Sequence, residues 1–539
     1  MGVDFRKGGS VHLTPNSGTS HTIGILQLLE AASRLRFTAN RFAPINQLPP
    51  ELLCEVFFYL RPVVEEEPRR PWSTELPFED LLAVTHTCQR WRETAIVARK
   101  LWSQLNVRNS SESLDGLTRL FIRRSGLLPL DATVDRQLVA ITPYIPRLRI
   151  LSCTVSTQDL STLREHPAPL LETLHILSYH HPLLTTPLPA LFKGETPSLR
   201  KLYVNGFDPF PNNDFRGLSS LRLRLSSGGG DPAFWVQLLA VLRHSPWLEE
   251  IFLYLGPDYN NFPSPEGIST PVALRALQRL HIQGLASTLV RRFLKSISLP
   301  PSGTAMQFTD TSHSNWTSLP TLPLDLSSQA VTSLEIIYYH ETGLAIQGTN
   351  SKTQIRIAET TDSNAMRAEI FPQLTPRTDQ HPLRELWIHV GRRTNFILLP
   401  LSKFPQLRKI VVRAAPGGNL ICRVLRQLET TDGYVPCPLL STLDLSGVVD
   451  VGLLTEVLKT RLRAGHKLRR LRVGKTRGLR EEIGRVRVRD FVDRLKIFDV
   501  DAEPRGMQLP VVCTTDLGEW WRPWTPEGVT PVGGRAHRT

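Results

Sequence analysis

The chain has 539 residues, of which 41% are hydrophobic and 21% are charged. This composition is typical of a folded protein and excludes a disordered one, while the length exceeds what one compact core can organise. The 64 basic and 50 acidic residues give a net charge of +14, which favours an anionic partner: nucleic acid, an acidic protein or anionic lipid.

Residues 1–44 are expected to form an N-terminal extension with one short amphipathic helix. Apolar residues recur there at helical spacing, at Ile25, Leu28, Leu29, Ala32 and Leu35. Gln27 and Glu30 interrupt the segment and no convincing cleavage site follows, which disfavours a secretory signal. A mitochondrial presequence is a second alternative, but Asp4 and Glu30 break its basic character.

Neither a membrane span nor a disulfide framework is expected. No apolar run approaches the roughly 18 residues that a spanning helix needs. The six cysteines are scattered and form no C-x-x-C pair, so we predict neither disulfides nor a zinc site. These features favour a reducing, intracellular location, in the cytoplasm, the nucleus or both.

Two helical stretches follow the extension. The first begins at Pro49-Pro50 and runs to residue 60, with a proline at a position that favours a helix start. A proline- and charge-rich insert, 61–79, is predicted to be a loop. The second stretch is predicted over residues 80–107 from its apolar spacing.

Residues 45–107 resemble the F-box, which is found in a large group of fungal proteins that carry a C-terminal leucine-rich-repeat-like solenoid. The matching positions are Leu48, Pro49, Glu51, Leu52, Leu53, Val56, Phe57, Leu60, Val84, Cys88, Trp91, Ala95, Leu101 and Trp102. The insert between the first two helices, 61–79, departs from the family's compact core.

The resemblance implies docking on the Skp-type linker of a cullin-RING ubiquitin ligase. The residues implied are Leu48, Pro49, Pro50, Glu51, Leu52, Leu53, Val56 and Phe57. So small a module cannot bury all of these apolar groups, and apolar groups left on a surface indicate a partner. The residues Val84, Cys88, Trp91, Leu101 and Trp102 are expected in the module's own core. The alternative is a helical cap on the first repeat of a C-terminal solenoid.

A helical linker is expected over 108–145, followed by a repeat region over 146–500. The pattern L-x-x-L-x-L, with Ile, Val or Cys allowed, recurs twelve times, starting at residues 148, 171, 199, 218, 248, 277, 331, 383, 407, 440, 468 and 492. Helical stretches lie between, such as 231–245 and 451–465. The fold class predicted is α/β: a leucine-rich-repeat solenoid of parallel strands with helices. Segments 301–330 and 341–381 break the rhythm, as long loops or variant repeats.

In each repeat strand the leucines should point inward and the residues between them outward. These outward positions make a candidate target-binding concave face: Lys201, Tyr203, Arg222, Arg224, Phe252, Tyr254, Arg279, His281, Trp387, Lys409, Arg413, Arg470 and Arg472, with His389, Arg494 and Lys496 alongside. Such a face suits an acidic or phosphorylated protein segment. An ordinary solvated sheet face is the alternative.

No catalytic, metal or cofactor motif is found in the sequence. Gly474-Lys475-Thr476 resembles the end of a phosphate-binding loop, but Arg469 occupies the position of its first glycine. The tail, 501–539, carries Trp520, Trp521 and Trp524 and has no assignment. Together with the absence of these motifs, the resemblance to the F-box implies a non-enzymatic substrate adaptor of an SCF (Skp–cullin–F-box) ligase. The alternatives are an interaction scaffold or a nucleic-acid-binding solenoid without a ligase role.

Overall fold

The computed structural model describes most of the chain in two compact units. The first unit comprises residues 1–133 and 147–149, and the second comprises 134–146 and 150–539. The residues described within them are 18–60, 79–107, 116–135, 138–178, 190–206, 211–225, 232–255, 270–285, 287–300, 304–310, 332–339, 343–349, 354–359, 383–390, 398–414, 419–431, 433–474 and 479–498. The predicted loop at 61–79 (save Glu79) and the tail at 501–539 lie outside them.

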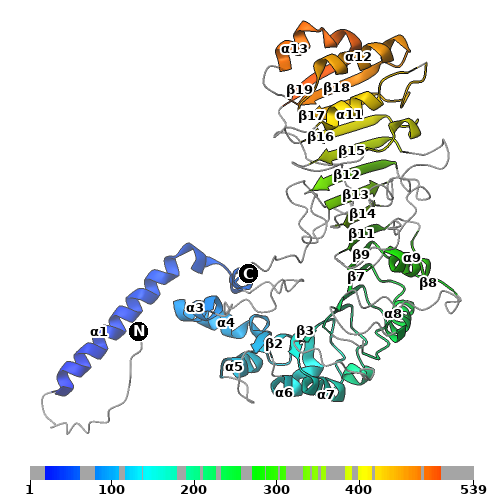
Figure 1. The fold of residues 1–539 in the computed structure, drawn as a ribbon. Coiled ribbons are helices and arrows are strands. Elements are labelled where there is room, and N and C mark those ends of the chain that lie inside the picture. Colours follow the sequence, from blue (N-terminus) through cyan, green and yellow to red (C-terminus); the bar gives the residue numbers. More distant parts are fainter. Residues whose placement is uncertain are drawn as a thin grey trace, which may run out of the picture. The chain divides into compact units, whose positions relative to one another are not determined.

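The first unit is mainly helical (Figure 1). Its elements are α1 (Gly18–Phe42), η1 (Pro44–Gln47), α2 (Pro50–Phe58), α3 (Glu79–Thr87), α4 (Gln89–Val97), η2 (Arg99–Trp102), β1 (Gln104–Val107), α5 (Gly116–Ser125) and β2 (Leu130–Asp135), whose last residues belong to the second unit. The N-terminal helix α1 is longer than predicted, and its described side chains are nearly all exposed. No helix in the described ranges is long and apolar enough to cross a membrane.

Two predicted helical segments are more broken than expected. The stretch 80–107 is α3, α4, η2 and a strand, β1, because Cys88 takes an extended conformation with φ −155° and ψ 167°. In 108–145, the described part likewise contains the strand β2 among its helical turns. The apolar spacing typical of a helix therefore continues across positions where the backbone ends one helix and begins another element.

The second unit has a main sheet of mostly parallel strands and a separate two-stranded sheet, Val272–Ala273 with Ile297–Ser298, with helices between the strands (Figure 1). Its strands are β3 (Leu148–Val155), β4 (Thr173–Ser178), β5 (Lys201–Asn205), β6 (Ser220–Leu225), β7 (Glu250–Leu255), β8 (Val272–Ala273), β9 (Arg279–Gln283), β10 (Ile297–Ser298), β11 (Ala305–Asp310), β12 (Ser333–Tyr339), β13 (Gly343–Thr349), β14 (Gln354–Glu359), β15 (Glu385–Val390), β16 (Lys409–Ala414), β17 (Thr442–Ser446), β18 (Leu468–Gly474) and β19 (Val492–Phe498). All twelve L-x-x-L-x-L segments coincide with strands, which confirms that part of the prediction.

Helices precede β3 and connect many of the strands that follow, as predicted. They are α6 (Leu138–Ile141), η3 (Thr142–Arg147), α7 (Thr157–Glu165), η4 (Leu191–Gly194), α8 (Pro232–His244), α9 (Ser287–Lys295), η6 (Leu401–Lys403), α11 (Leu420–Gln427), α12 (Val451–Arg463), α13 (Leu479–Arg485) and η7 (Val488–Phe491). Capping fixes two of the starts. The Ser156 hydroxyl accepts from the Asp159 amide in a capping box before α7, and the Asp450 carboxylate accepts from the Leu453 amide before α12.

Strand order accounts for the described parts of the two segments that interrupt the repeats: β11 lies in 301–330, and β13 and β14 lie in 341–381. Strands β3, β4, β5, β6, β7, β9 and β11 pair in parallel, as do β15 to β19. Between these two runs lies β14, parallel to β11, then β13, antiparallel to both of its neighbours, then β12, parallel to β15. The described part of 332–359 is therefore a three-stranded meander continuing the sheet.

One backbone hydrogen-bond pattern repeats at the entry to successive strands. A carbonyl accepts from two consecutive amides of the next strand: Glu172 from Arg200 and Lys201, Ser219 from Glu249 and Glu250, and Ser441 from Arg469 and Arg470. The carbonyls of Arg200, Glu249, Thr332, Arg384 and Arg408 do the same. Because the same hydrogen bonds recur, each repeat places its strand against the strand of the previous repeat in the same register.

The repeat leucines form the core of the second unit. Leu171, Leu199, Leu218, Leu248, Leu277, Leu383 and Leu407, the first residues of seven motifs, are all fully buried. Where strand β17 ends, Gly447 has φ +143°, and a Cβ there would lie 2.9 Å from the Ala414 carbonyl oxygen. Glycine is required at this turn for both reasons.

Candidate protein-interaction sites

The helix α2 divides its apolar residues between a buried and an exposed face. Leu53 and Phe57 are fully buried, and the Phe57 ring lies 5.3 Å from the Trp91 ring on α4. Leu52 and Val56 are 53% and 40% exposed. The resemblance implied all four as linker-binding residues, but Leu53 and Phe57 are covered by the protein itself, Phe57 by its packing against α4.

The exposed face continues into the turn that precedes α2. Pro49, Pro50 and Glu51 are exposed, and Leu48 is half-buried. Two side chains of α4 hold this turn: the Arg90 guanidinium donates to the Leu48 carbonyl at 2.6 Å, and the Trp91 indole donates to the Asn46 side-chain oxygen at 2.6 Å. The structure therefore holds Leu48 to Leu52 and Val56 in one defined, partly apolar surface, named here the α2 face.

The predicted core residues of this module differ in depth. Trp102 and Leu101 are buried, and the Trp102 indole donates to the Ala95 carbonyl at 2.7 Å. The Arg124 guanidinium lies 4.2 Å from the Trp102 ring centroid. Val84 is buried as well, whereas Trp91 and Cys88 are half-buried, Cys88 preceding α4 as its N-cap residue.

The α2 face lies in a segment that is similar to a known family. Residues 45–108 match the F-box-like family. That match covers the α2 face together with the helices α3 and α4, which form the F-box-like module of the chain. A search of curated proteins found no match.

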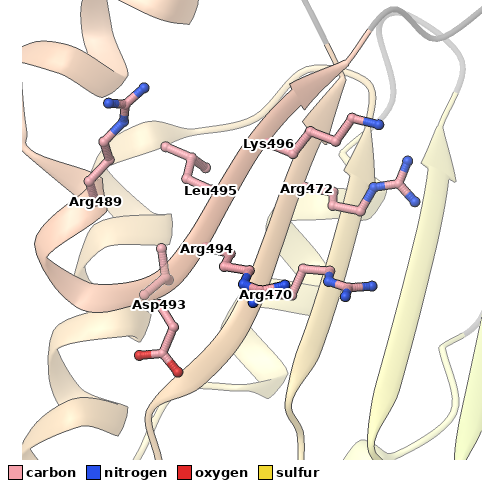
Figure 2. A pocket seen from close by; sticks show the side chains of 8 residues that line it. Arg470, Arg472, Arg489, Asp493, Arg494, Leu495 and Lys496 are labelled. Carbon is pink, nitrogen blue, oxygen red and sulfur yellow. The ribbon is translucent and has the colours of Figure 1, made fainter.

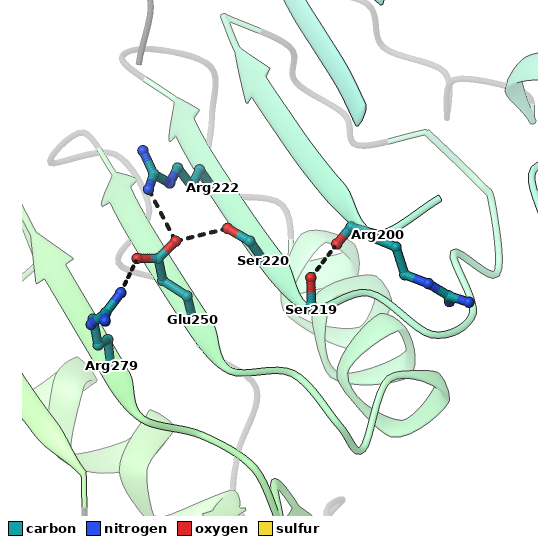
Figure 3. A network of polar contacts seen from close by, with 6 residues as sticks. All are labelled: Arg200, Ser219, Ser220, Arg222, Glu250 and Arg279. Carbon is teal, nitrogen blue, oxygen red and sulfur yellow. Dashed lines mark hydrogen bonds and ion pairs between the residues drawn. The ribbon is translucent and has the colours of Figure 1, made fainter. Parts of the chain in front are cut away.

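On the sheet face, the strands β6, β7 and β9 carry a polar network (Figure 3). The Glu250 carboxylate accepts from the Ser220 hydroxyl at 2.9 Å, the Arg222 guanidinium at 3.0 Å and the Arg279 guanidinium at 3.4 Å. The Arg222 and Glu250 side chains are only 9% and 12% exposed. These two arginines were predicted as free binding groups, but here they act in a cross-strand ion-pair network.

Several other predicted face residues are also covered by neighbours. His281 is buried, with its ring edge-on to Phe252 at 4.7 Å, and burial, followed by the charge of Arg222, lowers the His281 pKa to about 3. Trp387 and His389 are buried, contrary to the prediction. Since side chains on adjacent strands stand about 4.8 Å apart on one face, large ones cover each other.

The remaining predicted face residues are at least partly accessible. Lys201, Tyr203, Phe252, Tyr254, Arg279, Lys409, Arg413 and Arg472 are half-buried, while Arg224 and Arg470 are exposed. The Arg224 guanidinium lies 4.9 Å from the Tyr254 ring centroid. The Lys409 ammonium contacts the Trp387 ring and the Glu385 carboxylate, 3.2 Å away.

The last strands of the sheet form an open basic pocket of about 760 Å³ (Figure 2). It is lined by Arg470, Arg472, Arg489, Val492, Asp493, Arg494, Leu495 and Lys496. Arg489 comes from η7 and was missed by the sequence reasoning, because it lies outside the strand pattern that selected the other cations. No cluster of three or more His, Cys, Asp and Glu side chains able to hold a metal occurs in the described residues.

Proposed function

We propose that this protein is a substrate-recognition adaptor of an SCF (Skp–cullin–F-box) E3 ubiquitin ligase. The observation that carries the proposal is the α2 face. Leu52 and Val56 remain solvent-exposed on a helix whose Leu53 and Phe57 side chains are buried, within a segment that matches the F-box-like family. Domains of that family commonly bind Skp-type linkers of cullin-RING ligases.

The second unit would be the target-binding part, organised as a leucine-rich-repeat solenoid. Twelve motif strands and the recurring strand-entry hydrogen bonds support this architecture. The sheet face between the leucines would hold a target protein. Such an adaptor would act in the cytoplasm or nucleus without catalytic groups of its own. It would raise the effective concentration of target lysines near the conjugating enzyme, which other subunits hold.

The linker interaction can be tested with the full chain. The double variant Leu52→Ala/Val56→Ala should weaken capture of a purified Skp-type linker by at least about tenfold, because truncating central apolar residues of an interface typically costs about 2 kcal/mol or more. Both side chains are exposed, so the variant should fold as the wild type does. A matched control is Leu127→Ala/Val139→Ala, which truncates two exposed apolar side chains outside the F-box-like segment.

Capture that is lost in the first variant and retained in the control supports the adaptor role. Equal capture by both variants would show that the α2 face is not the linker site. No capture by the wild-type chain would reject the ligase role and leave the alternative, a helical cap on the repeat region. Co-capture of a cullin with the linker is the further outcome that an assembled ligase requires.

A further inference from the structure

The strands β18 and β19 place like charges directly opposite each other. In the parallel register, Arg470 faces Arg494 and Arg472 faces Lys496. Figure 2 shows the Arg470 and Arg494 side chains extending from neighbouring strands toward the same region. Like charges that stand opposite each other on adjacent strands destabilise a sheet. Arg472 is compensated by Asp444, so Arg470 and Arg494 are the opposed pair that folding does not explain.

The carboxylates near this site do not neutralise it. The Asp444 carboxylate pairs with Arg472 at 3.2 Å, and Asp493 pairs with Lys467 at 2.8 Å. Burial raises the pKa of Asp444, although Arg472, Arg413, Lys409 and Lys496 act in the opposite direction. Within the described residues, Arg470, Arg489 and Arg494 have no ion pair, so at least three positive charges remain at the pocket.

On other strands of the sheet face, cations form ion pairs or lie over aromatic rings. Arg222 and Arg279 share Glu250, Arg224 lies over Tyr254, and Lys409 is paired with Glu385. Between the arginines of β6 to β9 and those of β18 and β19, the described face carries the buried Glu335 and His389, 3.0 Å apart, and the aromatic Trp387. A continuous basic track of the kind that follows a nucleic-acid backbone is therefore not formed by the described side chains.

We infer that the pocket on β18, β19 and η7 binds a phosphorylated segment of a protein, with Arg470 and Arg494 as the phosphate-binding groups; Arg489 lies apart from them, across β19. An arginine guanidinium can donate two hydrogen bonds to the oxygens of a phosphate, and the double negative charge of the phosphate balances two of the cations. Leu495 lies on the same side of β19 as Arg489 and gives the pocket an apolar part, against which a side chain further along the segment would pack. A localised pocket with an apolar part favours a peptide over a polynucleotide.

This inference deepens the proposed function, since the phosphorylated segment would belong to the target. The test uses the full chain and fluorescent pools of degenerate peptides with a fixed central phosphoserine, compared with the same pools carrying serine. Arg470→Gln/Arg494→Gln is the variant. Arg164→Gln/Arg243→Gln is the matched control, because it removes the same charge from two exposed arginines on α7 and α8.

We expect the phosphoserine pool to bind in preference to the serine pool, and the Arg470→Gln/Arg494→Gln variant to bind it at least about tenfold more weakly. The control should bind as the wild type does. Because opposed like charges are removed, the thermal midpoint of the variant should be unchanged or higher, so lost binding cannot be ascribed to unfolding.

Three results would overturn the inference. These are equal retention of the serine and phosphoserine pools, equal binding by the two double variants, and tighter binding of a single-stranded RNA or duplex DNA probe than of the phosphopeptide pool. The last result would assign the pocket to nucleic acid. The linker test remains separate: Arg470→Gln/Arg494→Gln should still capture the linker, and Leu52→Ala/Val56→Ala should still bind the phosphopeptide pool.

Discussion

Replacing Glu250 with alanine should destabilise the strands β6, β7 and β9 by about 3–5 kcal/mol. Glu250 accepts two hydrogen bonds of good length, from Ser220 and Arg222, and a longer one from Arg279. Hydrogen bonds to charged groups contribute about 1.5–3 kcal/mol each, and removing one partner of a buried ion pair typically costs about 3–5 kcal/mol. Glu250→Gln keeps the side-chain shape and an acceptor, so its effect should be smaller.

Hydrogen exchange measured by mass spectrometry is the suitable assay, because a repeat-like sheet need not unfold in one step. For amides that exchange through opening of these strands, 3–5 kcal/mol corresponds to an acceleration of about a hundredfold to several thousandfold. Glu249→Ala is the control, since Glu249 is exposed and directly precedes β7. If both variants exchanged alike, the network would not stabilise the sheet and the reasoning would fail.

Three further predictions concern individual buried groups. Phe57→Ala should destabilise the F-box-like module by about 3–5 kcal/mol, because it removes a fully buried ring, whereas Val56→Ala should have little effect. Hydrogen exchange of the amides in α2 and α4 measures both effects. Similar losses of stability in the two variants would contradict the assignment of Phe57 to the buried face and Val56 to the exposed face. His281, with its pKa lowered to about 3, stays neutral in the folded state while the unfolded chain binds a proton below about pH 6.5. Stability should therefore fall as pH drops from about 6.5 toward 3, by up to about 1.4 kcal/mol per unit, and His281→Gln should reduce that slope relative to wild type in parallel acid titrations. The Cys437 thiol, fully buried and with its pKa raised to about 12 by burial, should resist alkylation in the native state, while the half-buried Cys88 should react faster; native labelling of Cys437 detected by mass spectrometry would refute this.

For α2, the sequence predicts a helix but does not determine which of its apolar residues are buried. Leu52, Leu53, Val56 and Phe57 form one broad apolar stripe, because each residue turns a helix by about 100°. The stripe predicted a helix with a buried side, and it also matched the F-box pattern. Which half of the stripe is buried depended on where α4 lies, since the contact between Phe57 and Trp91 joins residues that are distant in the sequence.

The sheet shows the same division between sequence and tertiary structure. Alternation in the L-x-x-L-x-L segments predicted every one of their strands, because a period of two is a local property of the chain. The meander of β12, β13 and β14 was not predicted, since strand pairing depends on contacts across the sheet. Likewise, the sequence by itself determined that arginines occupy the face of the sheet. Only the register between strands decided that Arg222 meets Glu250 and is neutralised, while Arg470 meets Arg494 and is not.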